Sequence, residues 1–204
     1  MPGSFAWAGG DEIEVDLDPT PYEGYTPFGN IAPQGSMVSL SYFDNALFIG
    51  HSILNGLSQN YTNRIPSAGF YTRDSATTTS ILAETELNYM GITVSEDGSK
   101  SVQACSGSLE DALDGYPYQK VYIMLGINEV GNINLFRTNL CKIIDLVRAK
   151  LNNPTVYLIS ITPTSKSYLS RSLSFKRSNL LSFNSTMMQV SIDKNVYYQI
   201  GRAS

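Results

Sequence analysis

The sequence predicts an α/β fold: a mostly parallel sheet with helices on both faces. Three short runs, 46–49, 121–125 and 156–161, are almost continuously apolar, as strands buried on both faces are. An apolar stripe at helical spacing separates the second run from the third. Strands that alternate with helices in this way are typical of parallel sheets with crossover helices.

Each element has its own signal in the sequence. The runs 46–49 and 121–125 end at Gly50 and Gly126, and Pro154 and Pro163 flank the third run. Weaker runs at 68–71 and 195–200 predict two further strands. The helical stripe consists of Phe136, Leu140, Ile143, Ile144, Val147 and Leu151. Its helix is expected to begin at a cap formed by Asn132 or Asn134. A second helix is expected over 175–190, with Met187 and Met188 as core residues.

Composition and charge exclude several classes of function. The chain has 204 residues, 42% of them hydrophobic, and a net charge of −4, which argues against nucleic acid as a partner because phosphate binding favours a basic surface. It has no run of about 18 apolar residues, so no membrane span is expected. The single histidine, His51, excludes a multi-histidine metal site, and we expect neither a metal nor a cofactor. Cys105 and Cys141 allow one disulfide or none.

The charge is distributed unevenly along the chain. Seven acidic residues precede the first basic residue, Arg64, whereas nine basic residues and two acidic ones lie between Lys142 and the end. Residues 1–36 also hold five of the nine prolines, so we interpret 1–36 as an acidic arm or linker and 37–204 as the domain. Two interpretations of the arm stay open: a solvated tether, or a segment that lies across the basic C-terminal half.

The candidate catalytic residues are those that directly follow the apolar runs, because ligands bind at the carboxyl ends of parallel strands. Ser52 follows the first run, where a strand-to-helix turn would expose its hydroxyl beside the N–H groups of a helix N-terminus. The alternative is a serine that only caps the helix. Asn128 follows the second run and would donate its amide to an oxyanion at Ser52, or else cap the next turn. Glu110, Asp111 and Asp114 are interpreted as a solvated loop cluster and not as a metal site.

Together, the segments FIGHS at 48–52 and VYIMLGINE at 121–129 resemble the SGNH (GDSL-like) hydrolase superfamily, in particular its bacterial GDSL-type esterases and acylhydrolases. The resemblance implies a flavodoxin-like three-layer α/β/α fold and a serine esterase acting on a small ester or an acylated carbohydrate. It implies Ser52 as nucleophile, and an oxyanion hole formed by Ser52 N–H, Ser75 N–H and the Asn128 amide. It also suggests an extracytoplasmic location, although the sequence itself does not specify the compartment.

Three departures from the family pattern bear on activity. His51 stands where the family has an aspartate, and Ser75 stands near a family glycine, keeping the backbone N–H but lacking the φ freedom of glycine. The family's final Asp-x-x-His block is absent before Ser204, and His51 is expected to be poorly placed to act as base for Ser52. Three hypotheses follow: an impaired esterase, a non-catalytic module that binds a glycan, acyl group or protein, and a C-terminally shortened chain. In the last case, we expect self-association into a homo-oligomer through uncovered C-terminal surface.

Overall fold

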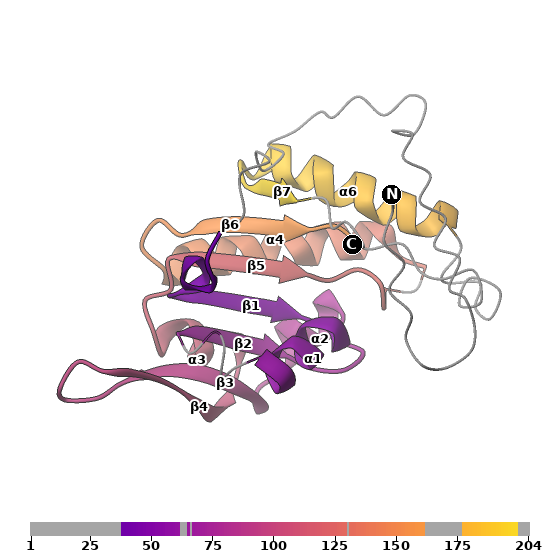
Figure 1. Cartoon of the computed structure of the whole chain (residues 1–204). Coiled ribbons are helices and arrows are strands. Elements are labelled where there is room, and N and C mark those ends of the chain that lie inside the picture. The colour runs from indigo at the N-terminus through magenta and orange to yellow at the C-terminus, as the bar shows by residue number, and fades with distance from the viewer. Residues whose placement is uncertain (1–37, 62–64, 66, 130, 162–176, 200–204) are drawn as a thin grey trace, which may run out of the picture.

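The computed structural model describes residues 38–61, 65, 67–129, 131–161 and 177–199 (Figure 1). The acidic arm, residues 1–36, lies outside the described residues. The described elements, in chain order, are η1 (Leu40–Phe43), β1 (Ala46–Gly50), α1 (Ser52–Tyr61), β2 (Ala68–Thr72), α2 (Thr78–Ala83), β3 (Leu87–Val94), β4 (Lys100–Gly107), α3 (Leu109–Asp114), β5 (Lys120–Met124), α4 (Ile133–Lys150), β6 (Thr155–Ile159), α6 (Arg177–Asp193) and β7 (Tyr197–Gln199).

The described strands form one seven-stranded sheet in the order β4-β3-β2-β1-β5-β6-β7. The five strands from β2 to β7 in this order run parallel, whereas β3 and β4 are antiparallel. β1 is central, and all five of its residues are buried. The predicted α/β fold with a mostly parallel sheet is therefore confirmed, and the carboxyl ends of β1, β2 and β5 meet at one edge of the sheet.

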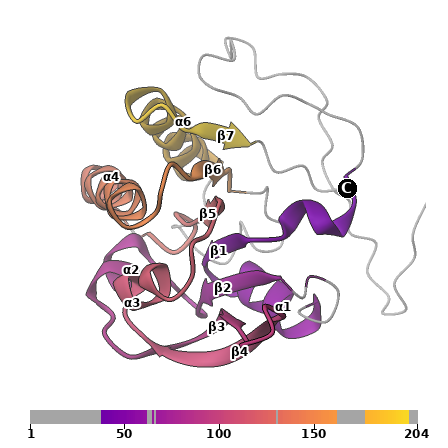
Figure 2. The ribbon, with the colours of Figure 1, turned by 90° about the vertical axis from the view of Figure 1, so that its left-hand side faces the viewer.

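Helices cover both faces of the sheet, but unequally (Figure 2). α2, α3, α4 and α6 pack on one face, where they enclose the larger hydrophobic core. On the opposite face the described chain supplies α1 and η1, over a smaller core. The predicted helical stripe of α4 faces the larger core, and its six residues are buried.

A row of stacked aromatic rings crosses the α1 face of the sheet. It contains one residue from each of five neighbouring strands at matching register: Phe70, Phe48, Tyr122, Tyr157 and Tyr197. Neighbouring ring centroids lie 4.8–5.3 Å apart and the ring planes are within 21° of parallel. Phe70, Phe48 and Tyr122 are buried, Tyr157 is half-buried, and Tyr197 at the end of the row is 41% exposed.

The sequence patterns did not predict the antiparallel hairpin of β3 and β4, and they placed the acidic residues of α3 in a loop. β4 is polar and mostly exposed, so it lacks the apolar run that marks a buried strand. The signal for the hairpin was the Asp97-Gly98 turn, in which Gly98 has φ +80°. The prediction that Glu110, Asp111 and Asp114 lie in a loop is wrong, because all three belong to α3. Asp111 forms a capping box with Ser108 there, a Ser-x-x-Asp pattern that is legible in the sequence.

Candidate active site

The turn from β1 into α1 presents Ser52 at the carboxyl edge of the sheet. β1 ends at Gly50 and α1 begins at Ser52, whose side chain is exposed. This is the predicted strand-to-helix turn, next to the N–H groups that the first turn of a helix leaves without intrahelical partners. The Ser52 hydroxyl is therefore accessible to a ligand, and the helix dipole favours negative charge beside it.

His51 points away from solvent and offers no base to Ser52. Its side chain is only 1% exposed, and Nδ1 accepts a long hydrogen bond, 3.4 Å, from the backbone N–H of Ile53. A neutral imidazole that accepts at Nδ1 carries its proton on Nε2. Nε2 is buried and has no hydrogen-bond partner within the described part of the chain. Neither ring nitrogen is therefore hydrogen-bonded to Ser52 Oγ in a catalytic dyad.

The buried imidazole makes folding stability depend on pH. Desolvation lowers the pKa of His51 below its ordinary value of 6.5, so below pH 6.5 the unfolded chain binds a proton that the folded chain does not. We expect the free energy of unfolding to fall as the pH drops below 6.5, by up to about 1.4 kcal/mol per pH unit for this one proton. Urea unfolding between pH 7.5 and 5.5 measures this slope. His51→Gln should flatten it, and an equal slope in the variant would assign the pH dependence to other groups.

The loop after β2 lies against the β1–α1 turn. Arg73 donates its backbone N–H to the carbonyl of Gly50 at 3.2 Å. The Asn55 amide, one helical turn after Ser52, donates to the carboxylate of Asp74 at 3.0 Å. Although serine lacks the φ freedom of glycine, Ser75 in this loop adopts the left-handed conformation with φ +56°. The backbone conformation that a glycine would favour is thus present.

The loop after β5 joins the same group. The Asn128 side chain, half-buried, donates Nδ2 to the carbonyl of Ala76 at 3.1 Å, one residue beyond Ser75. Glu129 accepts a hydrogen bond from the backbone N–H of Thr78. These contacts hold Asn128 beside the β2 loop and leave its second amide N–H for another acceptor.

Hydrogen bonds thus connect the segments that follow three neighbouring strands, β1, β2 and β5. Ser52 lies in the first of these segments, Ser75 in the second and Asn128 in the third. Asn55 and Asp74, which connect two of these segments, were not singled out from the sequence. The available signal was the spacing of Asn55 three residues after Ser52, which places both on one side of α1. No group of three His, Cys, Asp or Glu side chains suited to a metal ion lies within the described residues, and both cysteines are free. None of the described helices is long and apolar enough to cross a membrane.

Comparison with known proteins gives structural relatives only. No protein-family model matches the sequence, and no curated protein matches it significantly. The fold is similar to that of a GDSL-like lipase from Bacteroides thetaiotaomicron, at a TM-score of 0.54 and 12% identity over 76% of this chain and 67% of that one. It is also similar to a DUF4886 family protein from Bacteroides uniformis, at a TM-score of 0.52 and 12% identity over 76% of this chain and 65% of that one.

A third similar structure is a carbohydrate acetylesterase from Sinorhizobium meliloti, at a TM-score of 0.50 and 14% identity over 76% of this chain and 82% of that one. At such low identities these similarities show the fold alone. The chain spans about two thirds of the length of the first two relatives.

Proposed function

We propose that this chain, which has the fold of the SGNH (GDSL-like) hydrolases, binds a small ester or an acylated carbohydrate at the carboxyl edge of its sheet. Ser52 is the proposed nucleophile. The observation that supports it is the exposed serine at the start of α1, beside the hydrogen-bonded loops of Ser75 and Asn128. The similarity to an acetylesterase fold favours acyl groups on sugars as one substrate class.

In the proposed reaction, Ser52 Oγ attacks the ester carbonyl and forms a tetrahedral intermediate. The backbone N–H groups of Ser52 and Ser75 and the Asn128 amide donate to its oxyanion, and one such donor contributes about 3 kcal/mol where it operates. Collapse of the intermediate releases the alcohol and leaves an acyl group on Ser52, which water then hydrolyses. Because His51 does not serve as base, the Ser52 hydroxyl proton passes to solvent water, and solvent supplies the proton that the leaving alcohol takes up.

The proposed site is impaired in these 204 residues because the base is missing. His51 is the only histidine in the sequence. Its Nδ1 accepts a hydrogen bond from the Ile53 N–H, and its Nε2 is buried without a partner among the described residues. Without an activated nucleophile, an oxyanion hole and substrate binding still provide a residual rate enhancement of about 10³–10⁴ over water, far below that of a full triad. We therefore propose slow acyl transfer to Ser52 and not efficient turnover.

Hydrolysis of p-nitrophenyl acetate tests this proposal. Ser52→Ala should reduce the rate to the buffer background, whereas Ser185→Ala, at an exposed serine of α6, should leave the rate unchanged. Intact-mass spectrometry should detect one acetyl group on the unsubstituted chain and none on Ser52→Ala. Equal rates and no acetylated species in all three proteins would overturn the acyl-transfer proposal.

The buried, proton-bearing Nε2 of His51 favours one alternative, a non-catalytic module that binds acylated glycans at the same edge. This alternative predicts saturable binding of an acetylated oligosaccharide without release of acetate, which isothermal titration calorimetry and acetate analysis distinguish. Ser52→Ala would then keep the affinity.

A further inference from the structure

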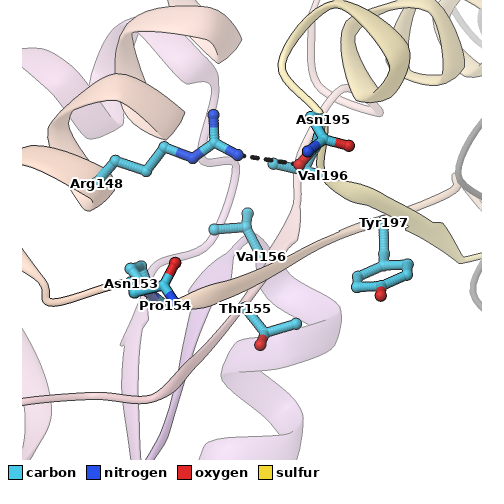
Figure 3. Close-up of a pocket in the computed structure, with 8 residues that line it drawn as sticks. All are labelled: Arg148, Asn153, Pro154, Thr155, Val156, Asn195, Val196 and Tyr197. Carbon is cyan, nitrogen blue, oxygen red and sulfur yellow. Dashed lines mark hydrogen bonds between the residues drawn. The ribbon is translucent and has the colours of Figure 1, made fainter.

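A cavity of about 560 Å³ at the amino edge of the sheet does not form a single binding site (Figure 3). Arg148 reaches it from α4, on the face of the larger core, whereas the ring of Tyr197 belongs to the aromatic row on the opposite face. The guanidinium and the ring are therefore unable to hold the same ligand.

A second cavity gathers its lining on one face of the sheet. It has a volume of about 310 Å³ and lies between α1 and the hairpin of β3 and β4. α1 packs against β1 and β2, and the hairpin continues the sheet beyond the helix. One wall bears Asn55, Ser58 and Gln59 of α1, and the floor includes Met90 and Ala104, which are cross-strand partners. We call this cavity the α1 groove.

The α1 groove begins beside Ser52. The spacing of Ser52, Asn55 and Gln59, at i, i+3 and i+7, places all three on one side of α1. With a rise of about 1.5 Å per residue, Asn55 lies about 4.5 Å and Gln59 about 10.5 Å from Ser52 along the helix axis. Asn55 accepts a hydrogen bond from Thr72 Oγ1 at 3.4 Å and donates to Asp74 at 3.0 Å, so its carboxamide is fixed in place. A ligand with its ester at Ser52 therefore extends directly into the groove.

Three polar side chains of the α1 groove have no hydrogen-bond partner among the described residues. Ser58 is only 5% exposed, yet its hydroxyl bonds to none of them. Gln59 and Asn88 are exposed, and their carboxamides are equally without a described partner. Leaving a buried hydroxyl unpaired costs free energy, and a ligand that pairs with it recovers that cost. The lining thus favours a ligand rich in donors and acceptors.

The charge and polarity of the α1 groove narrow the choice of ligand. No charged side chain lines it within the described part of the chain, and the carboxylate of Asp74, bonded to Asn55 at one end, disfavours an anion there. The floor is apolar, with Met90 half-buried and Ala104 exposed. A long acyl chain would cover the polar wall without bonding to it, which is costly. An uncharged ligand with hydroxyl and amide groups and a small apolar substituent matches the whole lining.

We propose that the α1 groove binds an uncharged sugar unit that carries an acetamido group, and that this unit is the carbohydrate part of the ester presented to Ser52. The acetamido methyl packs on the apolar floor. The carboxamides of Gln59 and Asn88 bind the acetamido amide, and the Ser58 hydroxyl binds a sugar hydroxyl. The role of this sugar in a reaction rests on the function proposed for Ser52, whereas its binding does not require the Ser52 hydroxyl.

Calorimetric titration of the whole chain with N,N′-diacetylchitobiose tests this proposal, because this disaccharide has acetamido groups but no ester. A Kd of about 0.1–1 mM is expected, in the range of weak specific binding. Cellobiose has hydroxyl groups in place of the acetamido groups and should bind at least about fivefold more weakly, because the pairing with the two carboxamides is lost. Digalacturonate, which is anionic, should also bind at least about fivefold more weakly.

Matched variants separate the α1 groove from the rest of the surface. Asn88→Ala should weaken binding about three- to tenfold, which corresponds to one lost neutral hydrogen bond. Asn152→Ala removes the same carboxamide from an exposed position between α4 and β6 and should change the affinity less than twofold. Ser58→Ala should weaken binding about three- to tenfold without lowering the free energy of unfolding, because the hydroxyl has no described partner in the free protein. Lower stability with unchanged affinity would overturn the role of Ser58.

Ser52→Ala separates this proposal from acyl transfer, because it should bind the disaccharide like the unsubstituted protein. Retained binding without acetylation of Ser52 would contradict the function proposed for Ser52 alone, and acetylation without disaccharide binding would contradict the α1 groove alone. In nuclear magnetic resonance, the backbone amide shifts of Asn88 and Ala104 should move on addition of the disaccharide, and that of Thr155 at the amino edge should not. Absence of saturable binding up to about 10 mM, equal affinity for cellobiose, or shift changes confined to the amino edge overturns the proposal.

Discussion

Replacing Gly50 with alanine should destabilise the protein by about 2–3 kcal/mol, the upper part of the usual range of about 1–3 kcal/mol for forced overpacking of a core. Gly50 is the buried last residue of the central strand β1. A Cβ atom there would lie 2.5 Å from the backbone oxygen of Met124 on β5 and 2.7 Å from Cδ1 of Leu54. The Met124 oxygen cannot rotate away as a flexible side chain would, so β1 and β5 must separate. Urea unfolding measures the loss.

The same change should also disturb the candidate active site. Gly50 accepts the backbone hydrogen bond from Arg73 and directly precedes His51 and Ser52. Movement of β1 would therefore shift the nucleophile relative to the β2 loop, and acylation of Ser52 should fall in the Gly50→Ala variant even under conditions where it is folded.

Gly56→Ala is the matched control for Gly50→Ala. Gly56 lies within α1, and nothing lies within 4 Å of the position of its added Cβ. Alanine is a better helix former than glycine, so the free energy of unfolding of this variant should rise by about 0.5–1 kcal/mol. Equal stability of the Gly50→Ala variant and the unsubstituted protein would show that β1 and β5 are not held as closely as the structure describes.

The sequence predicted the parallel strands from their apolar runs, which fit best at β1 and β5, because these two strands are buried on both faces. β6 was predicted from a similar run, although only alternate residues of this strand are buried and the others are half-buried. The apolar stripe of α4 is buried against the core. The hairpin of β3 and β4 was missed because its outer strand, at the sheet edge, is mostly exposed and does not need apolar residues. Its hydrogen bonds are made by the backbone, which composition does not reveal.

The candidate active site was predictable in part. Strand ends identified Ser52 and Asn128, since the topology of parallel sheets brings such ends together. The link between Asn55 and Asp74 was not predictable, because two residues 19 apart in sequence meet only after the sheet has set the position of the β2 loop. The burial of His51 depends equally on tertiary packing, which no local pattern encodes.

Phe48→Ala should have the largest effect on stability of any change discussed, about 3–5 kcal/mol, as for other buried phenylalanines. Phe48 is 5% exposed at the centre of the aromatic row. It stacks on Phe70 at 5.0 Å and on Tyr122 at 4.9 Å, and it also contacts the ring of Phe43 in the segment that leads into β1. Removing this ring leaves a cavity bordered by three aromatic side chains that the sheet backbone prevents from closing in. Urea unfolding and near-ultraviolet circular dichroism should both report the loss.

Tyr197→Ala is the matched comparison for Phe48→Ala. Tyr197 occupies the same register of the same row, but it has one described stacking neighbour and is 41% exposed, so its removal should cost no more than about 1 kcal/mol. Equal losses for Phe48→Ala and Tyr197→Ala would mean that the row stabilises the fold uniformly along its length. A large difference would mean that the inner rings maintain the sheet while the outermost one can be replaced without unfolding.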